Sequence, residues 1–123
     1  AGALLVGDLA KQLHDLPAAL RPQLVLVSVD PARDTPAVLA EYTAYFDPNL
    51  IGVTGTAQAI ERFARALGVA MQKGPVVDGT YTVDHTAAIF LVNPQAELAA
   101  VMPTPHVVAT IAADYRAIVQ QAR

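Results

Sequence analysis

The sequence contains no cysteine and no tryptophan among its 123 residues, and only 15% of the residues are charged. Without cysteine, these residues cannot form a disulfide, a thiolate metal site or a thiol nucleophile. The formal net charge is -3 and no Lys/Arg cluster occurs, so no nucleic-acid partner is expected. No apolar run approaches the roughly 20 residues that a membrane-spanning helix needs.

What the sequence does contain is material for a packed core, because 54% of its residues are hydrophobic. The length indicates a single domain or a part of one, and the composition does not resemble that of a disordered chain. No repeat or low-complexity tract interrupts it.

The first half of the sequence alternates helical and strand patterns. Apolar residues spaced by three or four from Leu5 to Leu20 predict a helix, at least as far as Pro17. Residues 23–30 (QLVLVSVD) predict a strand buried on both faces. Thr35-Pro36 then predicts the start of a helix, by an N-cap and a proline at the first helical position. The apolar side of this helix is expected to consist of Val38, Leu39, Tyr42 and Phe46.

The second half continues the alternation. Residues 50–53 predict a short strand, Thr56 predicts the cap of a helix that stops at Gly68, and 69–72 predict a brief strand. Residues 87–92 and 97–102 form a predicted antiparallel hairpin, and a final helix follows Pro105. The pattern is that of an α/β protein with short strands in a mixed sheet.

Two segments carry a family resemblance. Residues 27–36 read VSVDPARDTP, and residues 81–92 read YTVDHTAAIFLV. In this order and at this distance they resemble the Sco/SenC family of copper-delivery proteins. The resemblance implies a thioredoxin-like mixed sheet flanked by helices, a copper site of two cysteines and one histidine, and delivery of copper to cytochrome oxidase.

The resemblance also implies that the chain is incomplete. In the family, a Cys-x-x-x-Cys motif lies at the start of the helix that leads into the 23–30 strand, which places it here at or just before Ala1. Either the chain is cut after the cysteines, or it is a cysteine-less relative. We favour truncation, because the strand that precedes the cysteines is absent as well. Residues 1–123 are then one thioredoxin-like domain, incomplete at its N-terminus.

The missing strand would be central in such a sheet, between the strands predicted at 23–30 and 87–92. Its absence leaves two apolar strand edges with unpaired N–H and C=O groups. We therefore expect the missing N-terminal segment, or another copy of the chain in a homo-oligomer, to fill the gap.

The candidate site consists of three residues. His85 matches the family's copper-binding histidine, and imidazole binds copper in either oxidation state; its alternative role is a histidine bonded to a backbone carbonyl. Asp84 either orients the His85 ring or accepts a backbone N–H in a turn. Asp30 ends a strand where the family has an aspartate near the metal, and its alternative role is that of a cap.

Other residues that could carry chemistry are expected to have structural roles. Arg33 and Asp34 are expected to form either an exposed pair or a network within the turn, of little energetic weight. His14 is expected on a solvated face, and Met71 and Met102 are expected to fill the core. No Ser/His/Asp set and no Gly-rich phosphate loop occurs, so no catalytic residue is assigned.

Three functions remain open. The first is a copper metallochaperone that holds Cu(I) or Cu(II) and passes it to the copper-site subunit of cytochrome c oxidase, with other copper chaperones as partners. The second is a thiol-disulfide oxidoreductase that acts on the oxidase cysteines. The third is a cysteine-less binding relative. The family reading implies a periplasmic bacterial protein, anchored to the inner membrane by an upstream segment.

Overall fold

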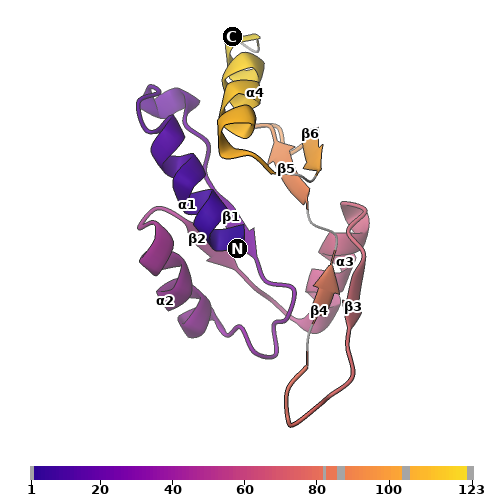
Figure 1. The fold of residues 1–123 in the computed structure, drawn as a ribbon. Helices are drawn as coiled ribbons and strands as arrows, with labels where there is room; N and C mark the ends of the chain where they lie inside the picture. Colours follow the sequence, from indigo (N-terminus) through magenta and orange to yellow (C-terminus); the bar gives the residue numbers. More distant parts are fainter. Residues whose placement is uncertain (1, 82, 86–87, 104–105, 122–123) are drawn as a thin grey trace. The chain divides into compact units, whose positions relative to one another are not determined.

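The computed structural model contains helices and short strands in the alternating order of an α/β protein (Figure 1). It describes residues 2–81, 83–85, 88–103 and 106–121, with side chains from residue 5 onward except at 84, 85, 88 and 103. Within these ranges the elements are α1 (Gly2–Leu13), the 3-10 helix η1 (Ala18–Leu20), β1 (Val25–Val27), α2 (Pro36–Phe46), β2 (Ile51–Val53), α3 (Ala57–Ala66), β3 (Met71–Lys73), β4 (Val83–His85), β5 (Ala88–Val92), β6 (Leu98–Pro103) and α4 (Val108–Gln121).

The chain divides into two compact units. The terminal unit consists of Ala1–Pro22 together with Ala87–Arg123, and the central unit consists of Gln23–Thr86. The terminal unit holds α1, β5, β6 and α4, whereas the central unit holds β1 to β4 with α2 and α3. No helix in the described ranges has both the length and the apolar character that crossing a membrane requires.

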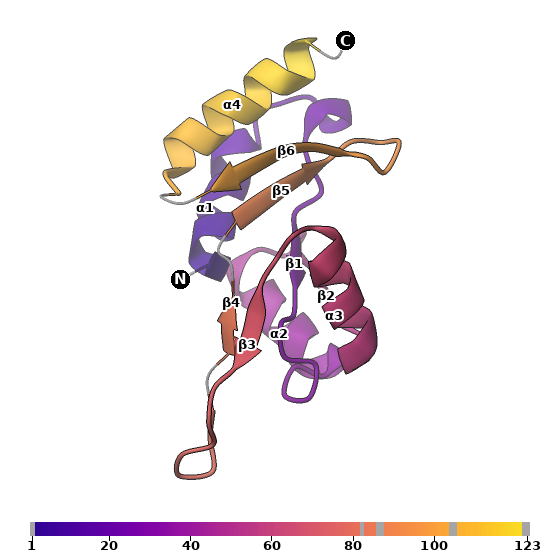
Figure 2. The same cartoon turned by 90° about the vertical axis from the view of Figure 1, so that its right-hand side faces the viewer.

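In the terminal unit, α1 packs against α4. The hydroxyl of Tyr115, on α4, donates a 2.6 Å hydrogen bond to the carbonyl of Leu20 and so ties this helix to η1. Strands β5 and β6 form the predicted antiparallel hairpin (Figure 2). In its register, Phe90 lies opposite Val101. The buried side chains of this unit are Leu9, Leu13, Leu16, Ile111, Ala112 and Tyr115.

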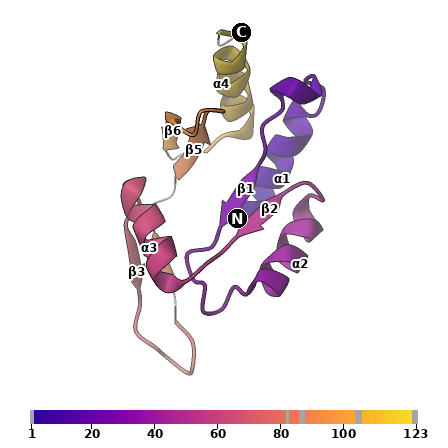
Figure 3. The ribbon, with the colours of Figure 1, turned by 180° about the vertical axis from the view of Figure 1, so that it is seen from behind.

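In the central unit, β1 and β2 pair in parallel and α2 connects them (Figure 3). Helix α2 lies close to β2 because Gly52 has no side chain: a Cβ built there would lie 2.5 Å from Cγ of Leu39. Leu39 and Thr43 are accordingly the buried residues of the helix. Val38 and Tyr42 were expected in the core, but they are 50% and 47% exposed, because the helix presents its Leu39–Thr43 side to the strand.

The helix boundaries agree well with the sequence. Thr35 accepts a hydrogen bond from the amide of Val38, and Thr56 accepts one from the amide of Ala59, so both predicted N-caps are confirmed. Gly68 has φ +75°, as the end of α3 requires. Helix α1, however, ends at Leu13 rather than at Pro17.

The strands are shorter than the apolar runs that predicted them. The run 23–30 contributes only Val25–Val27 to a strand, because pairing with β2 extends over three residues. In the described ranges the strands form one parallel pair and two antiparallel pairs. Strand β1 pairs with β2, and β5 pairs with β6.

Candidate functional site

His85 is the last residue of strand β4, which was not foreseen. The sequence predicts a strand only from residue 87 onward, but the backbone of 83–85 forms an antiparallel pair with β3. His85 lies opposite Met71, and Asp84 lies opposite Gln72. The side chains of Asp84 and His85 lie outside the described part of the chain, so their roles stay predictions.

Asp30 lies in the same unit, at the turn that follows β1, and it is 8% exposed. Its Oδ1 atom accepts a 3.0 Å hydrogen bond from the hydroxyl of Tyr81, and its Oδ2 atom accepts one from Nε of Arg33. Both carboxylate oxygens therefore have partners, as a buried charge requires. The backbone carbonyl of Asp30 also accepts from the amides of Arg33 and Asp34, so the turn begins at this residue.

Arg33 contacts Tyr81 as well as Asp30. Its Nη1 atom donates a 2.9 Å hydrogen bond to the carbonyl of Tyr81, and its guanidinium carbon lies 4.1 Å from the centre of the tyrosine ring. An arginine can hold two acceptors and a ring face at once because its donors form a rigid planar fork. Arg33 pairs with Asp30 rather than with Asp34, and both residues belong to a network within the turn, which was the second of the two expectations for them.

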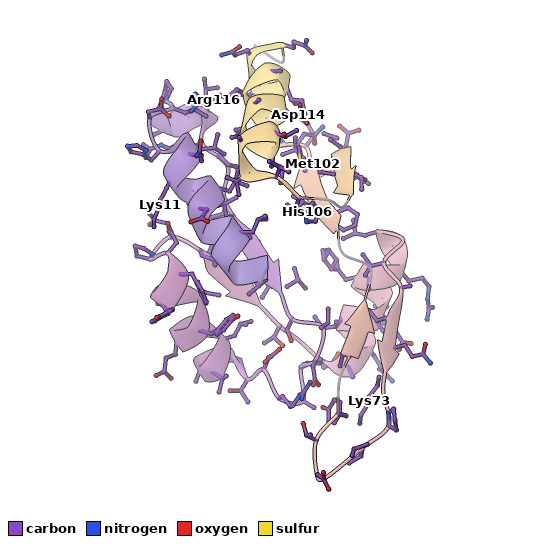
Figure 4. All side chains as sticks on the ribbon, in the orientation of Figure 1. Lys11, Lys73, Met102, His106, Asp114 and Arg116 are labelled. Carbon is purple, nitrogen blue, oxygen red and sulfur yellow. The ribbon has the colours of Figure 1, made fainter. Side chains whose placement is uncertain are left out.

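A lysine completes the surroundings of the ring. Nζ of Lys73, the last residue of β3, also lies 4.1 Å from the ring centre of Tyr81. Figure 4 shows Lys73 at the base of the loop between β3 and β4. Two cations thus contact one ring, an arrangement that the negative charge density of the ring faces favours.

Asp34 takes part in the network of the turn through Ser28. Its Oδ2 atom accepts a 2.7 Å hydrogen bond from the hydroxyl of Ser28, and that hydroxyl accepts a 3.0 Å hydrogen bond from the amide of Asp30. Ser28 is 4% exposed, so its hydroxyl needs these partners. These hydrogen bonds stabilise the turn after β1 without any contribution from Tyr81.

The contacts shift the acidity of two groups. Desolvation by burial would raise the pKa of Asp30, but the hydrogen bonds from Tyr81 and Arg33 outweigh it, and the pKa lies below its ordinary value. The hydrogen bond to Asp30, with a smaller effect of desolvation, raises the pKa of Tyr81. The aspartate is therefore ionised and the tyrosine protonated at neutral pH.

The other two histidines are held by backbone carbonyls of the terminal unit. Nδ1 of His14 lies 2.7 Å from the carbonyl of Lys11, and Nε2 of His106 lies 2.9 Å from the carbonyl of Met102. His106 lies two residues before α4 begins, and Figure 4 shows it below Met102. Among the residues that the structure describes, no group of three or more His, Asp or Glu side chains is placed to hold a metal ion.

Sequence reasoning missed Tyr81 and undervalued Arg33. Both residues belong to the two segments that carry the resemblance, since Arg33 follows Asp30 by three residues and Tyr81 precedes His85 by four. Their position within these two segments was the sequence signal that could have identified them. No pattern within either segment states that residues 48 positions apart will meet.

These features define an α/β protein in which a partly buried polar network adjoins the strand that ends at His85. The SCO1/SenC family model matches residues 4–120, so the chain belongs to this family. The chain is 36% identical over 95 residues to a Stutzerimonas stutzeri protein whose name describes it as copper-binding, a match that covers 76% of this chain and 47% of that protein. It is 40% identical over 74 residues to the human mitochondrial SCO1 homolog, covering 59% and 25%.

A solved structure supports the same fold. The crystal structure of Arabidopsis thaliana ScoI with copper bound superposes with a TM-score of 0.80 at 29% identity, covering 98% of this chain and 72% of that one. The predicted α/β, thioredoxin-like class is thereby confirmed. The chain spans about half or less of the length of these two curated relatives.

Proposed function

We propose that this domain is part of a copper metallochaperone that serves the assembly of the copper site of cytochrome c oxidase, with His85 as a copper ligand. Family membership and the copper-bound ScoI neighbour support copper as the cargo. The observation that carries the assignment to His85 is its place: it ends β4, in the segment that matches the family's histidine motif.

The residues of this chain do not form a copper site by themselves. They include no cysteine, and one imidazole does not provide the two or three soft ligands that Cu(I) prefers. The proposal therefore includes two thiolates from a Cys-x-x-x-Cys motif at or before Ala1, in polypeptide that the 123 residues do not contain. Copper binding by these residues alone is expected to be weak.

The proposal places the protein in the bacterial periplasm, anchored to the inner membrane through an upstream segment. The copper-site subunit of the oxidase and other copper chaperones are the proposed partners. The alternative within the same family framework is thiol-disulfide exchange on the oxidase cysteines, which would need the same two thiols but not an imidazole ligand.

The test uses the natural gene product, including the polypeptide that precedes Ala1. Its Cu(I) affinity is measured by competition with a chromophoric chelator, for wild type and for His85→Ala, and its thiol reactivity is titrated in parallel. His14→Ala is the matched control, because His14 is exposed and bonded to a backbone carbonyl. Loss of affinity in His85→Ala alone, with thiol reactivity retained, is the expected result.

Two results would contradict the proposal. A natural sequence without cysteines before Ala1 would favour a binding relative. Equal Cu(I) affinity in wild type and His85→Ala, with rapid disulfide reduction by both, would favour the oxidoreductase.

A further inference from the structure

Tyr81 is the meeting point of four contacts from two other parts of the central unit. Its hydroxyl bonds to Asp30, its carbonyl bonds to Arg33, and its ring contacts Arg33 and Lys73. We call the set Asp30, Arg33 and Tyr81 the tyrosine latch. The latch uses the backbone, the hydroxyl and the ring of one residue, so it fixes both the position and the orientation of Tyr81.

The turn that receives Tyr81 is prearranged. Ser28 bridges the amide of Asp30 and the carboxylate of Asp34, and the carbonyl of Asp30 accepts from the amide of Asp34 at 3.0 Å. These bonds fix the backbone of Asp30 without involving Tyr81, and the carboxylate of Asp30 accepts a separate hydrogen bond from Nε of Arg33. A preorganised acceptor loses little conformational entropy when it binds the tyrosine.

Strand β4 needs such an anchor. It pairs with β3 over only three residues, from Lys73 opposite Val83 to Met71 opposite His85. An isolated two-stranded ribbon of this length is marginal in water. Tyr81 lies two residues before β4 begins, so the latch ties the start of this strand to the turn after β1.

We infer that Tyr81 is a positioning residue for His85, which it holds through the latch and the backbone of β4. The inference rests on the proposed copper function. It assigns Asp30 to the latch, where it binds Tyr81 and Arg33, rather than to the His85 ring.

The test compares Tyr81→Phe with wild type in the natural gene product. The phenylalanine keeps the ring and removes only the hydroxyl bond to Asp30. The Cu(I) affinity of Tyr81→Phe is expected to fall about tenfold, as it does when residues that orient a metal-binding histidine are changed. The Cu(II) electron paramagnetic resonance spectrum is expected to change, and the amides of β4 are expected to exchange hydrogen faster. Tyr81→Leu, which also removes the ring, is expected to lose more affinity.

Two tyrosines serve as matched controls. Tyr45 is 85% exposed, so Tyr45→Phe is expected to change nothing. Tyr115→Phe removes a hydrogen bond to Leu20 in the terminal unit, so it is expected to lower stability and leave the copper spectrum unchanged.

Arg33→Lys keeps the charge but not the two-pronged donor, and it is expected to resemble Tyr81→Phe.

The outcomes separate the inference from the function on which it rests. If wild type binds copper and Tyr81→Phe has the same affinity and spectrum, the positioning role is wrong while the copper function stands. If β4 amides exchange at the same rate in both, the latch does not anchor the strand. If wild type itself binds no copper, the proposed function fails, and the positioning role fails with it.

Discussion

The α1–α4 helix pair of the terminal unit and the β1–β2 strands of the central unit differ in how much of their apolar surface they bury. In the helix pair, Leu9, Leu13 and Ile111 are at most 5% exposed. In the strands, Val25, Ile51 and Val53 are between 40% and 47% exposed. Val25 and Val53 line an open apolar hollow of about 290 Å³, together with Ile60 and Phe63 of α3.

The difference follows from how each element satisfies the N–H and C=O groups of its backbone. A helix makes its hydrogen bonds internally and needs one neighbour for its apolar face, whereas a strand needs neighbours on its edges as well. In the described residues β1 has β2 as its partner and β5 has β6. A sheet that lacks its central strand would consist of such two-stranded parts with half-exposed valines. The strand expected between β1 and β5 stays a prediction.

The largest effect is expected in the helix pair. Leu13 is 2% exposed, so Leu13→Ala should lower the free energy of unfolding by about 3 kcal/mol, through lost burial and the cavity that remains. Val25→Ala, at a residue 46% exposed, should lower it by less than about 1 kcal/mol. Urea unfolding of the chain, followed by circular dichroism, measures both values.

The same Val25→Ala substitution in the natural gene product tests whether further polypeptide covers this strand. If polypeptide before Ala1 covers this strand, the cost of the substitution should rise to about 2 kcal/mol, because the valine is then buried. The same small cost in both proteins would contradict the proposed covering strand.

The next effect concerns the close approach of α2 to β2 at Gly52. Gly52→Ala would place Cβ 2.5 Å from Cγ of Leu39 and 3.2 Å from Cγ2 of Thr43. The Leu39 side chain, or the helix α2 that carries it, must shift, and the cost should be about 1–3 kcal/mol. Gly55→Ala is the control, since its Cβ would meet that of Ala59 at an ordinary 3.7 Å. Restored stability in the double variant Gly52→Ala, Leu39→Ala would identify the clash as the cause, and equal stability of both glycine variants would contradict it.

A smaller effect is expected at the start of α3. Thr56→Ala leaves the amide of Ala59 without its 3.0 Å side-chain bond and should cost about 1 kcal/mol. Thr56→Ser keeps the acceptor and should cost little. Thermal unfolding of the two variants checks the cap, and equal losses would contradict it.

How far the sequence predicts this fold depends on the range of the interaction involved. Thr35, Thr56 and Gly68 mark helix ends by contacts within a few residues, so they could be recognised. The β5–β6 hairpin has a local turn signal and was predicted for the same reason. Strand β4 exists through pairing with β3 across a loop, and its residues show no strong alternation, so it was not foreseen.

The candidate site divides in the same way. His85 and Asp30 could be named because each lies in a segment with a family resemblance, and their direct part in copper binding stays a prediction. The meeting of Tyr81 with Arg33 depends on the path of the chain between them. The buried side of α2 was misjudged because it depends on Gly52, whose missing side chain selects Leu39 over Val38.

The smallest effect expected is a difference between two acidic groups at low pH. The pKa of Asp30 and that of Asp15 both lie below the ordinary 3.8, the latter chiefly through a hydrogen bond from Arg116. A lowered folded-state pKa means that the unfolded chain binds more protons, so each group stabilises the fold above about pH 3.8 and loses this effect as the pH falls through the folded-state value. The side chain of Asp30 is 11% exposed and that of Asp15 is 64% exposed, so solvent screens the second pair more strongly. Asp30→Asn should therefore flatten the dependence of unfolding free energy on pH between 2.5 and 5 more than Asp15→Asn does, and about 0.5 M salt should abolish only the Asp15 contribution. Equal flattening by the two variants, measured by urea unfolding across this range, would show that the buried network of the central unit is no stronger than the exposed ion pair of the terminal unit.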